Sequence, residues 1–171
     1  MAERSRDDGA LVQLSERLTN STAFSNLFRE GMDLVEETAA YLDGDGRTEA
    51  KALERSVSLT YATESMRLTT RLMQLASWLL LHRAVKEGEM TLIQANREKT
   101  KVKLSAADPG PADMIDKLPA QLQDLIARSM SLQSRVRRLD TTIHAPPPER
   151  PTTIGNPLVP QLNRLKAAFE Q

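Results

Sequence analysis

Histidine is the residue type in this sequence best suited to acid–base or phosphoryl chemistry, and the chain contains two histidines. Only His82 lies in a suggestive context, four residues before Lys86 and shortly before Gly88. Phosphotransfer domains also place a reactive histidine on a helical bundle, with a lysine or arginine nearby that neutralises the phosphoryl group. Their lysine and glycine usually follow the histidine more closely than in the run HRAVKEG found here. Because the dipole at the end of a helix also stabilises a histidine cation, a structural interpretation of His82 is favoured over histidine phosphotransfer.

The other reactive groups give no catalytic constellation. The chain has no cysteine, which excludes disulfides, thiol catalysis and cysteine-ligated zinc. Asp43, Asp45 and Glu54 are spaced like ligands of a calcium loop, but Arg47 and Thr48 stand where such a loop needs an acidic ligand and a glycine. The sequence therefore predicts no enzyme, no catalytic residue, no cofactor and no metal site.

Charge and hydropathy narrow the class of partner. Basic and acidic residues number 23 each, so the chain has no overall attraction to nucleic acid or to an anionic membrane. Basic residues do cluster at 97–103 and 128–138, which keeps a nucleic-acid-binding helical protein as an alternative, although no helix-turn-helix spacing is present. The longest apolar run, 72–81, is shorter than the ~20 residues of a membrane span. We therefore expect a soluble, cytoplasmic protein.

The stretch 48–87 contains His82 and the apolar run 72–81, and it has neither proline nor glycine. A continuous helix over this stretch would be about 60 Å long. Its middle is apolar almost all the way round, and such a helix has to be covered on every side. We therefore expect it to be the axis of a helical bundle, with surface left over for a second copy of the chain. The residues expected to hold this core and dimer are Leu72, Leu75, Trp78, Leu79 and Leu80.

Two apolar stripes run along this stretch, which implies at least two neighbours. The first stripe is Leu53, Val57, Tyr61, Leu68, Leu72, Leu75 and Leu79, and the second is Leu59, Ala62, Met66, Met73, Ala76, Leu80 and Ala84. Three charged residues interrupt them, Glu64, Arg67 and Arg71. The favoured interpretation is an exposed ion pair at the edge of an interface. The alternative is a polar contact that fixes the register between subunits.

A one-sided amphipathic helix is expected before this stretch, with Ser21 as its N-cap. Gly31 lies on the apolar side of that helix and costs about 1 kcal/mol against alanine. A close approach to the long helix would justify that cost. The helix is expected to stop at 43–46, where a glycine can take the left-handed capping conformation.

Two further helices are expected after Gly88. Thr91 and Gln94 have the spacing of a capping box that opens a short helix. Pro119 suits the first position of the last helix, where its missing N–H costs nothing. Apolar residues then alternate in steps of four and three, which predicts a narrow seam along one edge. That seam consists of Leu118, Leu122, Leu125, Ser129, Leu132, Val136, Leu139 and Ile143.

The chain is thus expected to divide into three parts. Residues 1–20 are predicted to form a flexible arm, residues 21–143 a helical bundle domain, and residues 144–171 a disordered, Pro-rich tail. The tail carries a helical stripe formed by Leu158, Leu162, Leu165 and Phe169. A segment this short is unstable alone in water, so it either folds on a partner or packs on its own bundle.

The stretch 61–85, YATESMRLTTRLMQLASWLLLHRAV, resembles the signature region of a small alphaproteobacterial family that includes the regulator of CtrA degradation. The family was long called a domain of unknown function. The specific part is the run ESMRLTTRLM followed by ASWLL. The similarity extends over residues 20 to 143, including the turn GEMT at 88–91.

This resemblance implies an all-α, three-helix bundle that forms a homodimer and has no catalytic residues. It also implies an adaptor role in regulated proteolysis. Such a protein docks on a ClpX unfoldase that a response-regulator-like partner has primed, and it helps deliver cell-cycle regulators to the ClpXP protease, often at a cell pole. The tail motif would then contact the protease or another partner. The residues alone predict only a helical interaction protein.

Overall fold

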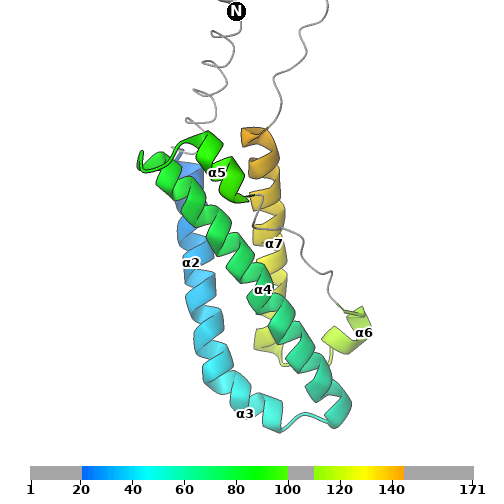
Figure 1. Ribbon diagram of the computed structural model, residues 1–171. Helices are drawn as coiled ribbons and strands as arrows, with labels where there is room; N and C mark the ends of the chain where they lie inside the picture. The colour runs from blue at the N-terminus through cyan, green and yellow to red at the C-terminus, as the bar shows by residue number, and fades with distance from the viewer. Residues whose placement is uncertain (1–20, 100–109, 145–171) are drawn as a thin grey trace, which may run out of the picture.

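The computed structural model describes residues 21–99 and 110–144, and this part of the chain is all-α, as predicted. Its helices are α2 (Thr22–Asp43), α3 (Asp45–Lys51), α4 (Arg55–Lys86), α5 (Leu92–Lys99), α6 (Ala112–Ile115) and α7 (Ala120–Ile143). Figure 1 shows α4 crossing diagonally in front of α2 and α7, with α5 beside one end of α4 and α3 near the other. The predicted N-terminal arm and Pro-rich tail lie outside the described residues.

The start of α2 follows the sequence pattern, but its end does not. Ser21 caps the helix as predicted, because its Oγ accepts a hydrogen bond from the N–H of Phe24 at 3.2 Å. At the other end Gly44 has φ −110°, so the expected left-handed cap is wrong. The chain passes directly into α3, whose Gly46 is buried. A helix here also excludes the calcium-loop geometry, which needs an extended loop.

The expected single helix over 48–87 is interrupted at 52–54. α3 ends at Lys51, and α4 begins at Arg55 after Glu54 adopts an extended conformation, with ψ 149°. α4 has 32 residues, or about 48 Å at 1.5 Å per residue. The break lets α3 stay against α2, where the Tyr41 hydroxyl donates to Glu49 Oε2 at 2.7 Å. Tertiary contact therefore overrides a sequence that has no helix breaker at this point.

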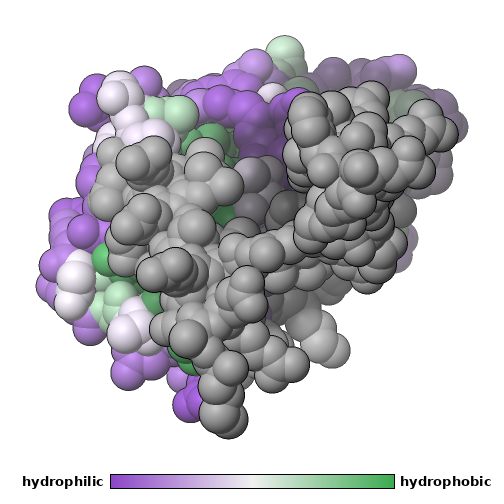
Figure 2. Space-filling view, turned by 90° about the horizontal axis from the view of Figure 1, so that it is seen from above, coloured by the Kyte–Doolittle hydropathy of each residue, from purple (hydrophilic) through white to green (hydrophobic). Residues whose placement is uncertain are grey.

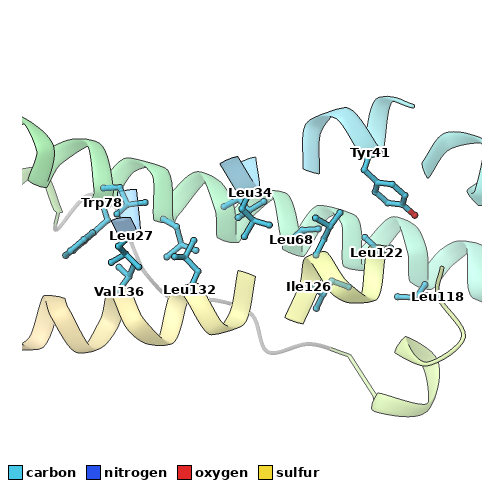
Figure 3. Packing of buried hydrophobic residues seen from close by; sticks show 14 of the residues in the cluster. Leu27, Leu34, Tyr41, Leu68, Trp78, Leu118, Leu122, Ile126, Leu132 and Val136 are labelled. Carbon is cyan, nitrogen blue, oxygen red and sulfur yellow. The ribbon is translucent and has the colours of Figure 1, made fainter. Parts of the chain in front are cut away.

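The core lies where α2, α4 and α7 meet, and Figure 3 shows its side chains from all three helices converging. Gly31 on α2 is buried at this junction, and a Cβ added to it would lie 2.5 Å from Leu79 Cδ1. This confirms the predicted close approach of α2 to the long helix. The core cluster comprises Phe24, Leu27, Leu34, Tyr41, Val57, Leu68, Leu72, Leu75, Trp78, Leu79, Leu118, Leu122, Leu125, Ile126, Leu132, Val136 and Ile143.

The two later helices begin as the sequence indicates. In the capping box before α5, the Thr91 N–H donates to Gln94 Oε1 at 2.9 Å and the Gln94 N–H donates to Thr91 Oγ1 at 3.2 Å. Pro119 is the N-cap of α7, one residue before the expected position. The predicted seam of α7 faces the core, widened by Ile126 and Gln133.

The surface of the described part is mainly polar at the end of the bundle viewed in Figure 2, where hydrophobic residues show only in small areas. Within the described ranges, no helix combines the length and the apolar character needed to cross a membrane.

Candidate interaction surface

The second apolar stripe of α4 is exposed. Leu59 is 67% exposed, Met66 71%, Met73 66% and Leu80 52%. These four side chains recur every seven residues, so they form one narrow line along the helix. Ala62, Thr69 and Ala76 lie three residues after the first three of them and complete a heptad pattern of large and small residues. We call this line, 59–80, the α4 seam.

None of the exposed residues along the α4 seam is charged, and the partly exposed Arg67 is paired with Glu64. Charged residues of α4 that are exposed lie beyond the two ends of the seam, at Arg55, Arg83 and Lys86. The exposed residues of α4 from Ser56 to Leu80 are Ser56, Leu59, Ala62, Thr63, Met66, Thr69, Thr70, Met73 and Leu80. An exposed helix face normally carries charged side chains, and a contiguous apolar surface indicates an interaction site.

Three hydroxyl groups on or beside this surface are already hydrogen-bonded within α4. Thr63 Oγ1 donates to the Leu59 carbonyl at 3.0 Å, and Thr69 Oγ1 donates to the Ser65 carbonyl at 2.8 Å. Ser77 Oγ donates in the same way to the Met73 carbonyl at 2.8 Å. Because these three hydroxyls keep their donor bonds without water, covering them costs less than burying free hydroxyls.

Four of the five residues expected to hold the core and dimer lie in the core of the single chain. Leu72, Leu75, Trp78 and Leu79 are buried against α2 and α7, and Figure 3 shows Trp78 reaching toward Val136. Leu80 lies instead on the α4 seam. The expected tail motif Leu158, Leu162, Leu165 and Phe169 lies outside the described residues.

Glu64 and Arg67 form the expected ion pair, but Glu64 is buried, so the expectation that the pair is exposed is wrong. Glu64 and Arg71 are each 2% exposed. Glu64 Oε1 accepts from Arg67 Nη1 at 2.5 Å and from the Gly110 N–H at 3.1 Å. Arg71 Nη1 donates to Ser129 Oγ on α7 at 3.0 Å. Burial lowers the pKa of Arg71, and the nearby Glu64 carboxylate opposes that shift. The Arg71–Ser129 contact joins α4 to α7 within one chain, and the Glu64–Gly110 contact joins α4 to the segment that precedes α6.

His82 is fully buried, which contradicts the expected helix-end cation. Its ring stacks on Trp78 with centroids 3.9 Å apart, and its Nδ1 lies 2.9 Å from the Trp78 carbonyl oxygen. Burial lowers the pKa of His82 to about 4, so the ring is neutral at pH 7 and desolvation outweighs the helix dipole. Nδ1 faces the Trp78 carbonyl and Nε2 faces His144, so neither ring nitrogen is open to a bulky phosphoryl donor, and Lys86 donates to Ser25 Oγ at 2.7 Å. The geometry argues against phosphotransfer.

A polar cluster around His82 was missed by the sequence reasoning. His144 Nε2 lies 3.3 Å from His82 Nε2 and 3.5 Å from Asp140 Oδ1. Asp140 also accepts from Trp78 Nε1 at 2.8 Å and from Lys99 Nζ at 2.6 Å. Burial lowers the pKa of His144 as well. The two histidines are 62 residues apart in the chain, so no local spacing in the sequence reveals the cluster. The one signal in the sequence is that the chain contains only two histidines.

Two of the arginines that supported the nucleic-acid alternative are paired with acids of α2. Arg128 donates to both carboxylate oxygens of Glu37, at 2.8 and 2.7 Å, and Arg135 donates to both oxygens of Glu30. These arginines hold α7 against α2. Their charge is therefore neutralised locally, which weakens the case for a phosphate-binding surface.

Comparisons with known proteins agree with this architecture. A family model described as "Protein of unknown function (DUF1465)" matches residues 15–169. The crystal structure of RcdA from Caulobacter crescentus CB15 is similar, with 49% sequence identity and a TM-score of 0.64. That similarity covers 77% of this chain and 98% of the RcdA chain. No curated protein matches the sequence significantly.

Proposed function

This chain belongs to the DUF1465 family as an RcdA-like member, and we propose that it is a non-enzymatic adaptor in regulated proteolysis. Its role is to help deliver cell-cycle regulators to the ClpXP protease, at a cell pole in the cytoplasm. The 49% identity to RcdA supports this role. So does the resemblance of 61–85 to the family that includes the regulator of CtrA degradation.

The observation that carries the proposal is the α4 seam, and its proposed occupant is a second copy of the chain. Leu59 and Leu80 are about 32 Å apart along the helix axis, which is long enough for an extended helix–helix contact. Because the apolar residues repeat every seven positions, the seam of one chain can pack against the same seam of a second chain related by a two-fold axis, as a symmetric dimer requires. Small side chains at positions 62, 69 and 76 allow two helices to approach closely. An uncharged surface also offers no charge pattern by which to select an unrelated partner.

A dimer gives the adaptor two of each binding element. The tail motif, Leu158, Leu162, Leu165 and Phe169, is the proposed contact to ClpX or to its response-regulator-like partner. Other surfaces of the bundle bind the protein cargo. Two linked contacts to the protease raise the effective concentration of the cargo at the unfoldase without any new interface.

The dimer is tested by placing charge in the α4 seam. The double substitution Met66→Glu with Met73→Glu puts two carboxylates of each chain into the proposed interface, where burying them is strongly unfavourable. We expect light scattering at micromolar concentration to give a two-chain species for the native chain and a single chain for this variant. Ile93→Glu is the matched control, because Ile93 is 71% exposed but lies on α5. A native chain that is single at 100 times this concentration would contradict the dimer.

Delivery is tested separately with purified ClpX, ClpP, the response-regulator partner and a cargo. Deleting residues 145–171 should slow degradation of the cargo while leaving the two-chain species intact. The Met66→Glu and Met73→Glu variant should slow delivery without removing the tail. Equal rates for the native chain and the deletion variant would remove the tail from the mechanism, and no stimulation by the native chain would refute the adaptor role.

A further inference from the structure

We propose that His82, Asp140 and His144 form a binding site for a divalent transition-metal ion, with Zn²⁺ as the ion that fits best. Each residue offers one ligand atom, and these atoms all lie within 4.8 Å of one another. It is the one cluster of this kind among the residues that the structure describes. Two imidazoles and one carboxylate form a ligand set that Zn²⁺ accepts, with water in the fourth position.

Two of the three distances between ligand atoms match a tetrahedral ion. Zinc binds imidazole nitrogen at about 2.0–2.1 Å, so two such ligands at the tetrahedral angle lie about 3.3 Å apart. The two Nε2 atoms are 3.3 Å apart, and His144 Nε2 is 3.5 Å from Asp140 Oδ1. Asp140 and His144 are four residues apart on one turn of α7, while His82 projects from α4. The side chains are therefore already close to the spacing that the ion requires.

The surroundings of His82 prepare it as a ligand. The Trp78 carbonyl beside Nδ1 can only accept a hydrogen bond, so Nδ1 carries the proton and Nε2 presents its lone pair toward His144. A metal-bound histidine typically donates its other N–H to a carbonyl or carboxylate in this way. The stacked Trp78 ring fixes the orientation of the imidazole, and the Trp78 Nε1 donor fixes Asp140. All three of these contacts come from Trp78.

The positive charge of Lys99 is expected to weaken binding of the ion. Its Nζ lies 2.6 Å from Asp140 Oδ2, so a positive charge already neutralises the carboxylate. Repulsion between this ammonium and a divalent ion weakens binding. We therefore expect a dissociation constant in the micromolar range, far weaker than that of a four-ligand structural zinc site. The bound ion would join the last turn of α7 to α4, immediately before residue 145.

The test uses the full-length, untagged chain, stripped of metal with EDTA and titrated with Zn²⁺ in a calorimeter. We expect one ion per chain. We also expect the midpoint of thermal unfolding to rise by about 5 °C when Zn²⁺ is present at 100 times its dissociation constant. The chain has only two histidines and no cysteine, so any imidazole-dependent binding arises at this site. Titration with Co²⁺ should give the visible absorption of a tetrahedral complex.

Two substitutions decide the location of the site. His144→Gln removes one nitrogen ligand at the end of α7 and should weaken Zn²⁺ binding at least tenfold. Lys99→Ala removes the opposing charge and should tighten binding by on the order of tenfold. Because the second change strengthens binding, it cannot be mimicked by a loss of folding. No heat of binding in the native chain, equal affinity in His144→Gln, or unchanged affinity in Lys99→Ala would each overturn the proposal.

Discussion

Gly31 is the position at which the packing of α2 on α4 is best tested. An alanine Cβ there would lie 2.5 Å from Leu79 Cδ1 and 3.6 Å from Leu132 Cδ2. Leu79 is fully buried, so its methyl group cannot move aside without disturbing other core residues. Gly31→Ala therefore forces either a rotamer change of Leu79 or a shift of α2 away from α4.

Two effects of opposite sign determine how much Gly31→Ala changes the free energy of unfolding. Alanine is better than glycine inside a helix by about 1 kcal/mol. Overpacking a filled core costs about 1–3 kcal/mol. We expect the free energy of unfolding to fall by about 1 kcal/mol, which corresponds to a decrease of about 2–4 °C in the unfolding midpoint of a chain of this size.

The decisive assay is urea unfolding of Gly31→Ala in two backgrounds. Leu79→Ala alone should cost about 2–5 kcal/mol because it leaves a cavity, but it also removes the methyl group that meets residue 31. In that background Gly31→Ala should raise the free energy of unfolding by about 1 kcal/mol, through helix propensity alone. The same effect of Gly31→Ala in both backgrounds would refute the proposed contact.

Two further substitutions test polar contacts between helices. Ser129→Ala removes the acceptor of Arg71 Nη1 and should lower the free energy of unfolding in urea by about 1–3 kcal/mol, because a buried charged donor loses a partner. Ser77→Ala is its control and should change stability by less than about 1 kcal/mol, since that hydroxyl bonds only within α4. Tyr41→Phe removes the donor to Glu49 Oε2 and should speed amide hydrogen exchange in α3, at a cost of about 1 kcal/mol. Unchanged exchange over 45–51 would show that this bond does not hold α3.

The features that the sequence predicted well are local ones. The Ser21 cap and the capping box at Thr91 and Gln94 involve residues three positions apart, so their spacing in the chain is their spacing in the helix. The seam of α7 follows from helical periodicity in the same way. Gly31 was found because a glycine on an apolar helix face is costly unless another element packs against it.

The predictions that were wrong concern features that depend on contacts between distant segments of the chain. The break between α3 and α4 has no helix breaker, and it reflects the packing of α3 against Tyr41. Glu64 and Arg71 lie in the protein interior, where Glu64 accepts a hydrogen bond from the Gly110 N–H and Arg71 donates one to Ser129. His82 and His144 are 62 residues apart. Local spacing carries no information about any of these pairs.

The distribution of side chains on α4 is the reverse of an ordinary surface helix, and this bears on what the working unit is. Its buried side includes Glu64 and Arg71, whereas its exposed side carries leucine and methionine every seven residues. Both buried charged groups make hydrogen bonds within one chain. The exposed apolar residues have no such partner within the described part of the chain. A helix with a filled inner face and exposed leucine and methionine on its outer face leaves apolar surface in water, and the proposed two-chain adaptor would cover that surface.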